Sequence, residues 1–136
     1  MTSEQLEALK VFVKKDLIIN EDNLQKISLG VPVLYHKYLD IFTEEFKVFQ
    51  DMTTNLKEAY GKLYDKYRFN SDKQLDGKAE IECYIFSDPI YIKKQYDYNV
   101  QQKVVKYLEG VLDTISKISF NVNNYVNYRK FLAGVN

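Results

Sequence analysis

Residues 33–69, VLYHKYLDIFTEEFKVFQDMTTNLKEAYGKLYDKYRF, decide the fold, because apolar side chains recur among them at steps of three and four. The series starts upstream at Leu24 and ends at Tyr67, which gives about six heptads of coiled-coil spacing. One continuous helix of that length would reach roughly 70 Å, whereas a compact chain of 136 residues is only about 30–35 Å across. Gly30 and Pro32 offer one bend. We therefore expect a mainly α fold built on a long, kinked helix whose coiled-coil-like seam is buried in an oligomer.

Three shorter segments also carry helical spacing. The first follows a capping box formed by Thr2 and Gln5. The last is rich in asparagine and therefore a poor intrinsic helix, so it is expected to depend on docking. The segments cover about residues 3–15, a region from about 97 or 99 to 115, and residues 120–134. No repeat or linker divides the chain, and we expect residues 1–136 to form a single helical oligomerising domain.

Residues 79–92 predict a small β-hairpin among these helices. Side chains alternate between two faces along residues 79–86, residues 87–89 (SDP) indicate a turn, and residues 90–92 (IYI) favour a second strand. The preceding polar stretch, residues 70–78, predicts a loop. Such a hairpin would be marginal alone and would need to be covered by a helix.

Charge is balanced over the whole chain but not along it. Nineteen basic and nineteen acidic residues cancel, which argues against a dedicated nucleic-acid binder because such proteins are usually basic. Residues 1–92 carry a net charge of −4 (12 Lys and Arg against 16 Asp and Glu), and residues 93–136 carry +4 (7 against 3). This asymmetry suits head-to-tail self-association or a local anionic partner.

Composition and motifs argue against the common catalytic and secretory classes. The five glycines are too far apart for a phosphate-binding loop, and neither His36 nor Cys83 has a neighbour that would complete a catalytic pair. Glu80 and Glu82 could bind a metal ion, but solvated charges at a strand edge are the commoner reason for such a pair. One cysteine forms no intrachain disulfide, and no stretch is long and apolar enough for a signal core or a membrane span. We expect a soluble intracellular protein that is not an enzyme and uses neither cofactor nor metal.

Residues 56–69, LKEAYGKLYDKYRF, interleave tyrosines with basic residues, as a platform for single-stranded nucleic acid would. On a helical wheel the tyrosines fall on one face that continues the seam, and Lys57, Lys62, Lys66 and Arg68 fall on its two flanks. Two interpretations stay open. The bases either cover the border of an apolar face while their charged ends stay in water, or they form a rim for a phosphate backbone. In both cases the tyrosines are mainly packing residues, so little base stacking is expected here.

Several segments resemble the UvsY family of phage recombination mediators, over nearly the whole chain. They are VKKDLII (13–19), LYHKYL (34–39), SDPIYIKK (87–94), YLEGVLDTISKISF (107–120) and YRKFLAG (128–134). The resemblance implies a small, mainly helical, non-enzymatic protein that forms a ring-like homo-oligomer in the cytoplasm of an infected host cell. It also implies binding of single-stranded DNA, and assistance to a RecA-like recombinase on strands covered by single-strand-binding protein.

The resemblance assigns DNA contact to a basic stretch in the middle of the chain, which here comprises Lys57, Lys62, Lys66 and Arg68. The chain departs from the family pattern at several positions, the last three of which relatives can fill with basic residues: Pro32, Gly61, Leu63 and Ile118. The DNA footprint is therefore expected to be shared with a second set of cations: Lys93, Lys94, Arg129 and Lys130.

Assembly is expected to bury the apolar seam. Its members lie in the long central series and in the C-terminal region that the resemblance links to assembly, and they are Phe46, Phe49, Leu56, Tyr60, Leu63, Tyr67, Val111, Ile115, Phe120, Tyr125 and Phe131. An alternative from a different class is a helical scaffolding oligomer that acts only through protein–protein contacts, which the overall neutrality of the chain favours.

Overall fold

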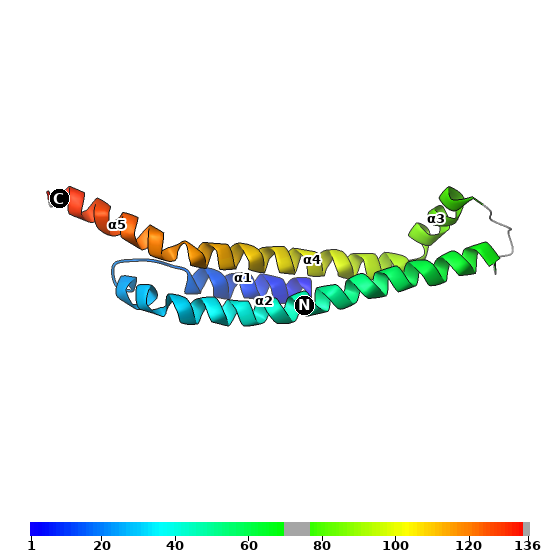
Figure 1. Cartoon of the computed structure of the whole chain (residues 1–136), viewed down its shortest axis with the longest axis horizontal. Coiled ribbons are helices and arrows are strands. Elements are labelled where there is room, and N and C mark those ends of the chain that lie inside the picture. Colours follow the sequence, from blue (N-terminus) through cyan, green and yellow to red (C-terminus); the bar gives the residue numbers. More distant parts are fainter. Residues whose placement is uncertain (70–76, 135–136) are drawn as a thin grey trace.

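The computed structural model describes residues 1–69 and 77–134, and every regular element in that part of the chain is a helix. The helices are α1 (Ser3–Asp16), α2 (Leu24–Phe69), α3 (Lys78–Ser87), α4 (Pro89–Ser116) and α5 (Ile118–Leu132). α4 packs along α2 in the opposite direction, and α1 lies beside both of them (Figure 1). α3 folds back near the end of α2, and α5 projects beyond α4 toward the C-terminus. The expected mainly α fold is confirmed.

α2 is the long helix that the apolar series predicts. It contains 46 residues and therefore spans roughly 70 Å. It begins after Asn20 and Asn23, whose side chains accept hydrogen bonds from each other's backbone amides at 2.9 and 3.0 Å, and it continues through Pro32 as one helix. The chain is consequently elongated (Figure 1), unlike the compact body expected of a domain this size.

α4 supplies the central stripe of the main hydrophobic core. Except for Val105, its buried residues lie three or four positions apart, and this spacing continues across the break at Lys117 into α5. Leu6 and Val13 of α1 and Tyr38 of α2 pack against the stripe. The stripe residues are Val104, Leu108, Val111, Ile115, Ile118 and Val122. α5 therefore docks through the face that continues α4, which explains how an asparagine-rich segment remains helical.

A second, smaller core lies at the other end of α2. Ile81 and Ile85 of α3 are fully buried, together with Leu63 of α2. The aromatic residues packed around them are Tyr60, Tyr64, Tyr67 and Tyr91. The tyrosines of the 56–69 run thus lie in a packing face, in agreement with the helical wheel.

The predicted β-hairpin is wrong, because residues 79–92 form α3 and the start of α4. Ile81 and Ile85 lie on one face of a strand, but they also lie four residues apart on one face of a helix, so the short run fits both periods. The helix is the form observed, because it buries both side chains against α2. Most of the predicted loop, residues 70–76, lies outside the described residues, and α3 already begins at Lys78.

The predicted turn at residues 87–89 is also a helix start. The Asp88 side chain accepts a hydrogen bond from the amide of Ile90 at 2.9 Å, and Pro89 occupies the first helical position. Proline suits that position because its missing N–H would have no partner inside the helix. α4 therefore begins at Pro89, earlier than the expected start near residue 97 or 99.

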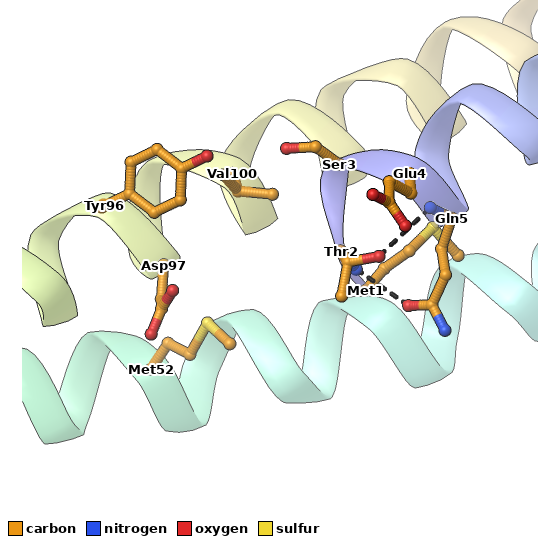
Figure 2. Close-up of a pocket in the computed structure, with 9 residues that line it drawn as sticks. All are labelled: Met1, Thr2, Ser3, Glu4, Gln5, Met52, Tyr96, Asp97 and Val100. Atoms are coloured by element: carbon orange, nitrogen blue, oxygen red, sulfur yellow. Dashed lines mark hydrogen bonds between the residues drawn. The ribbon is translucent and has the colours of Figure 1, made fainter.

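The ends of α1 and α5 follow their sequence signals. Thr2 and Gln5 form the predicted capping box, with the Gln5 amide donating to Thr2 Oγ1 at 3.2 Å and the Thr2 amide donating to Gln5 Oε1 at 2.8 Å (Figure 2). α5 ends before Gly134, which has a φ of 74° and donates its N–H to the carbonyl of Phe131 at 3.1 Å. Glycine adopts this left-handed conformation readily because it lacks a Cβ.

A buried tyrosine ties the end of α1 to α2. The Tyr38 side chain is 1% exposed, and its hydroxyl donates to Asp16 Oδ2 at 2.6 Å. Lys37 Nζ donates to the same oxygen at 2.8 Å. The hydrogen bonds from Lys37 and Tyr38 lower the pKa of Asp16, while burial and the Asp16 carboxylate raise the pKa of Tyr38 well above its ordinary range.

A second polar contact fixes the register of α4 on α2. Gln101 is fully buried, and its Nε2 donates to the backbone carbonyl of Glu45 at 2.8 Å and to Glu45 Oε2 at 2.7 Å. Its Oε1 accepts from the Met1 amine at 3.0 Å. A shift of α4 along α2 would leave this buried amide without partners, which is costly.

Replacing Tyr38 with phenylalanine tests the tie between α1 and α2. We expect Tyr38→Phe to lower the free energy of unfolding by about 1–2 kcal/mol, because it removes a hydrogen bond to a carboxylate and leaves the ring packing intact. Urea unfolding followed by circular dichroism measures the change. Tyr35→Phe is the matched control, since the half-buried Tyr35 hydroxyl has no hydrogen-bond partner among the described residues. Equal midpoints for both variants would contradict the assignment.

Candidate nucleic-acid interface

The four cations predicted on α2 all lie exposed along its C-terminal end. Neither Lys57 nor Lys62 has a carboxylate within ion-pair distance in the described part of the chain. The guanidinium carbon of Arg68 lies 5.0 Å from the centre of the Phe69 ring, in a cation–π contact at the surface. Within residues 1–69 and 77–134, Lys57, Lys62 and Arg68 therefore offer positive charge that is not held in an ion pair.

Lys66 differs from the other three because it faces Asp88. Its Nζ lies 3.9 Å from Asp88 Oδ2 and 5.3 Å from the centre of the Tyr67 ring. Asp88 is 5% exposed, and its Oδ2 also accepts from the Tyr67 hydroxyl at 2.6 Å. This hydrogen bond, the Ile90 amide and the Lys66 charge lower the pKa of Asp88 although burial opposes them. Asp88 thus joins α2 to the start of α4 and partly neutralises Lys66.

The structure brings Lys62 of α2 together with Lys94 of α4. Both line a hollow of about 180 Å³ between the two helices, with Glu58 as its one acidic residue. Lys93 does not line this hollow and forms an ion pair with Asp97 at 3.2 Å. Two of the predicted cations from separate helices therefore form one basic rim, whereas Lys93 is largely compensated.

Arg129 and Lys130 lie at the opposite end of the molecule, because α5 and the end of α2 point away from each other (Figure 1). The Arg129 guanidinium forms an ion pair with Glu21 at 2.6 Å, and Tyr125 donates to the same carboxylate oxygen at 2.8 Å. These residues and Lys130 line a shallow hollow of about 380 Å³. The eight predicted cations thus form two separate groups on one chain.

A comparison with protein families matches residues 12–135 to the family described as "Recombination, repair and ssDNA binding protein UvsY". The chain belongs to the UvsY family. Its fold is similar to crystal structures of the bacteriophage T4 recombination mediator protein UvsY. One of these structures has a TM-score of 0.82 and 22% sequence identity, and the match covers 98% of each chain. Another has a TM-score of 0.78 and 23% sequence identity, and the match covers 93% of this chain and 97% of the other. No curated protein matched.

Membership in the UvsY family, described by recombination, repair and binding of single-stranded DNA, confirms the resemblance seen in the sequence, and with it the expectation of a non-enzymatic protein. Within residues 1–69 and 77–134, no helix is long and apolar enough to cross a membrane. The same residues contain no group of three His, Cys, Asp or Glu side chains placed to hold a metal ion.

The predicted seam residues of this UvsY-family chain fall into three classes of exposure. Those buried within the chain are Leu63, Val111 and Ile115. The half-buried ones are Phe49, Leu56, Tyr60, Tyr67 and Tyr125. The exposed ones are Phe46 (37%), Phe120 (65%) and Phe131 (75%). α3 and α4 of the same chain cover much of the α2 seam, and the most exposed members lie on α5.

Sequence reasoning missed Asp88 and Gln101, which position the elements that carry the cations. The signal for Asp88 was present, since an N-capping residue followed by proline marks a helix start. Gln101 had no comparable signal, because a single glutamine among apolar helical positions resembles any surface residue. Gln101 fixes the register of α4 only through its hydrogen bonds to Glu45, which lies 56 positions away in sequence.

Replacing Asp88 with asparagine tests whether this carboxylate restrains Lys66. Asparagine still caps α4, but it removes the negative charge beside Lys66, so we expect severalfold tighter binding of an oligothymidylate at low salt and a salt slope steeper by up to about 1. Fluorescence anisotropy over a series of salt concentrations measures both. The control is Asp65→Asn, which removes an exposed carboxylate from α2, the helix that carries Lys66. Identical slopes in the two variants would show that Lys66 is not restrained.

Proposed function

We propose that this UvsY-family protein binds single-stranded DNA and helps a RecA-like recombinase to load onto strands covered by single-strand-binding protein. The observation that carries the proposal is the family match over residues 12–135, which spans all of the helices that hold the cations. The similar crystal structures are those of a recombination mediator. The protein would act as a ring-like homo-oligomer in the cytoplasm of an infected host cell.

The basic rim between α2 and α4 is the proposed DNA contact. Its two lysines, Lys62 and Lys94, are exposed, as is Lys57 about one and a half turns earlier on α2. None of the three has an acidic partner within ion-pair distance in the described part of the chain. Long lysine side chains adjust to a flexible phosphate backbone, and each phosphate they neutralise releases counterions. Tyr60 and Tyr67 point their hydroxyls at Glu82 and Asp88 inside the chain, so this rim would bind the backbone and not the bases. Arg129 and Lys130 supply a second, weaker contact.

Exposed surface supports the proposed oligomer. The chain exposes 9789 Å², whereas a compact monomer of its mass, 16.1 kDa, exposes about 7,400 Å². The excess of about 2,400 Å² is of the size that obligate oligomers bury. α5 contributes an outward apolar stripe of Phe120, Tyr128, Phe131 and Leu132. Side-by-side copies would also multiply the few cations of each rim, so that weak contacts add up to useful binding.

The function is tested by combining assembly, DNA binding and recombinase loading. Sedimentation with and without a labelled oligothymidylate measures the first two. Filament formation by a RecA-like recombinase on strands covered by single-strand-binding protein measures the third. We expect an oligomer that binds DNA with a steep salt dependence and shortens the lag of filament growth. An oligomer without DNA binding at low salt would instead favour the scaffolding alternative.

Removing the two lysines of the rim tests the DNA contact directly. We expect Lys62→Gln with Lys94→Gln to weaken oligothymidylate binding and to reduce the salt slope by up to about 2, because two phosphate contacts are lost. The control is Lys47→Gln with Lys14→Gln, which removes two exposed lysines away from the rim. Sedimentation verifies that both variants assemble alike. Equal loss of affinity in the two pairs would mean that the rim has no special role.

A further inference from the structure

The outer face of α4 presents aromatic side chains to solvent. Tyr96 is 62% exposed, Ile92 is 52% exposed, and Phe86 at the end of α3 is 51% exposed. With Tyr91 they line a hollow of about 500 Å³, whose other lining residues are the amides Gln95 and Asn99. The Phe86 and Tyr91 rings lie 5.5 Å apart. Unlike the tyrosines of α2, the Tyr96 ring is thus displayed outward.

Two lysines extend the same face. On a helical wheel with Ile92 at zero, Tyr96 lies at roughly 40°, and Lys103 and Lys106 lie at roughly 20° and −40°. The acidic residues of this stretch, Asp97 and Glu109, fall at roughly 140° and −100°, away from the face. In the described part of the chain neither lysine has a carboxylate within ion-pair distance. Between Ile92 and Lys106 the face therefore carries rings, amides and uncompensated positive charge, but no acid, and the next acid along it, Asp113, is paired with Lys117.

Tyr96 also borders a second hollow, and its surroundings indicate where an anionic strand would not run. That hollow, of about 550 Å³, lies between α4, Met52 of α2 and the start of α1 (Figure 2). Glu4 and Asp97 are the acidic residues that line this hollow. Asp97 points toward α2, whereas the Tyr96 ring lies away from α2 (Figure 2). The Met1 amine at this hollow is paired with Glu45, so it offers no free positive charge to a phosphate. A strand that reaches Tyr96 would therefore follow the outer face toward Lys103.

We propose that the outer face of α4 is a base-stacking site for single-stranded DNA, separate from the basic rim. Bases stack on Tyr96 and in the hollow beside Phe86, while phosphates lie over Lys103 and Lys106. Charge complementarity and exposed rings are the features that single-strand platforms combine. This inference rests on the proposed function, since it assumes that the protein binds single-stranded DNA. It adds a surface that recognises bases to one that recognises only the backbone.

The test compares an oligothymidylate with an abasic oligonucleotide of the same length. Stacking requires bases, so the ratio of the two dissociation constants reports it independently of assembly and avidity. We expect the native protein to prefer the oligothymidylate, and Tyr96→Leu to reduce that preference by about fivefold or more. Tyr96→Phe keeps the ring and should keep the preference. Lys103→Gln with Lys106→Gln should weaken both ligands equally and flatten the salt slope.

Phe12→Leu removes an exposed ring on α1, 63% exposed, and should change nothing. An unchanged ratio in Tyr96→Leu would overturn the inference, while salt-dependent binding of both ligands would leave the proposed function standing. Loss of assembly in Tyr96→Leu with an unchanged ratio would identify the face as a contact between subunits, and would likewise overturn it. If the native protein bound neither oligonucleotide, the proposed function and this inference would fail together.

Discussion

The antiparallel packing of α4 on α2 is the interaction on which the other elements depend. A 46-residue helix presents an apolar seam that is far too long for one short helix to cover. α4 covers the central part, and the two uncovered ends are closed by α1 and α5 on one side and by α3 on the other. Gln101 allows only one register of α4 on α2, because its buried amide finds both of its acceptors on Glu45. The positions of all surface charges follow from that register.

This packing also explains the character of the basic rim. α3 lies against the tyrosine face of α2, so the rings turn inward and the lysines on the flanks remain at the surface. α4 starts beside the same segment, since Asp88 is held by Tyr67, and this start brings Lys94 next to Lys62. Because α4 then runs along most of the main core before α5 begins, Arg129 and Lys130 end far from the rim (Figure 1). One chain therefore offers two modest basic sites instead of one strong site.

The sequence predicted features that depend on local periodicity, and it failed where distant segments decide. The 3–4 spacing from Leu24 to Tyr67 is long enough to exclude a strand, and the wheel correctly separated tyrosines from lysines within it. The run around Ile81 and Ile85 is too short to distinguish the two periods, and only its burial against Leu63 decides. The meeting of Lys62 and Lys94 requires the register of two helices, which no local pattern contains.

Because the chain is only two or three helices thick, nearly every helix has a face that points outward. The proposed DNA contacts and the proposed subunit contacts can therefore lie on different faces. The α2–α4 rim carries lysines, the outer face of α4 carries rings and lysines, and α5 carries an apolar stripe without acidic residues. α5 lies at the end of the molecule opposite the rim (Figure 1), so contacts between subunits through α5 would leave Lys62 and Lys94 uncovered, although they would involve the helix that carries Arg129 and Lys130. A compact fold with the same number of residues would place these surfaces close together. The length that α2 imposes would thus let the proposed assembly through α5 and the proposed DNA contact at the rim use different residues of the same chain.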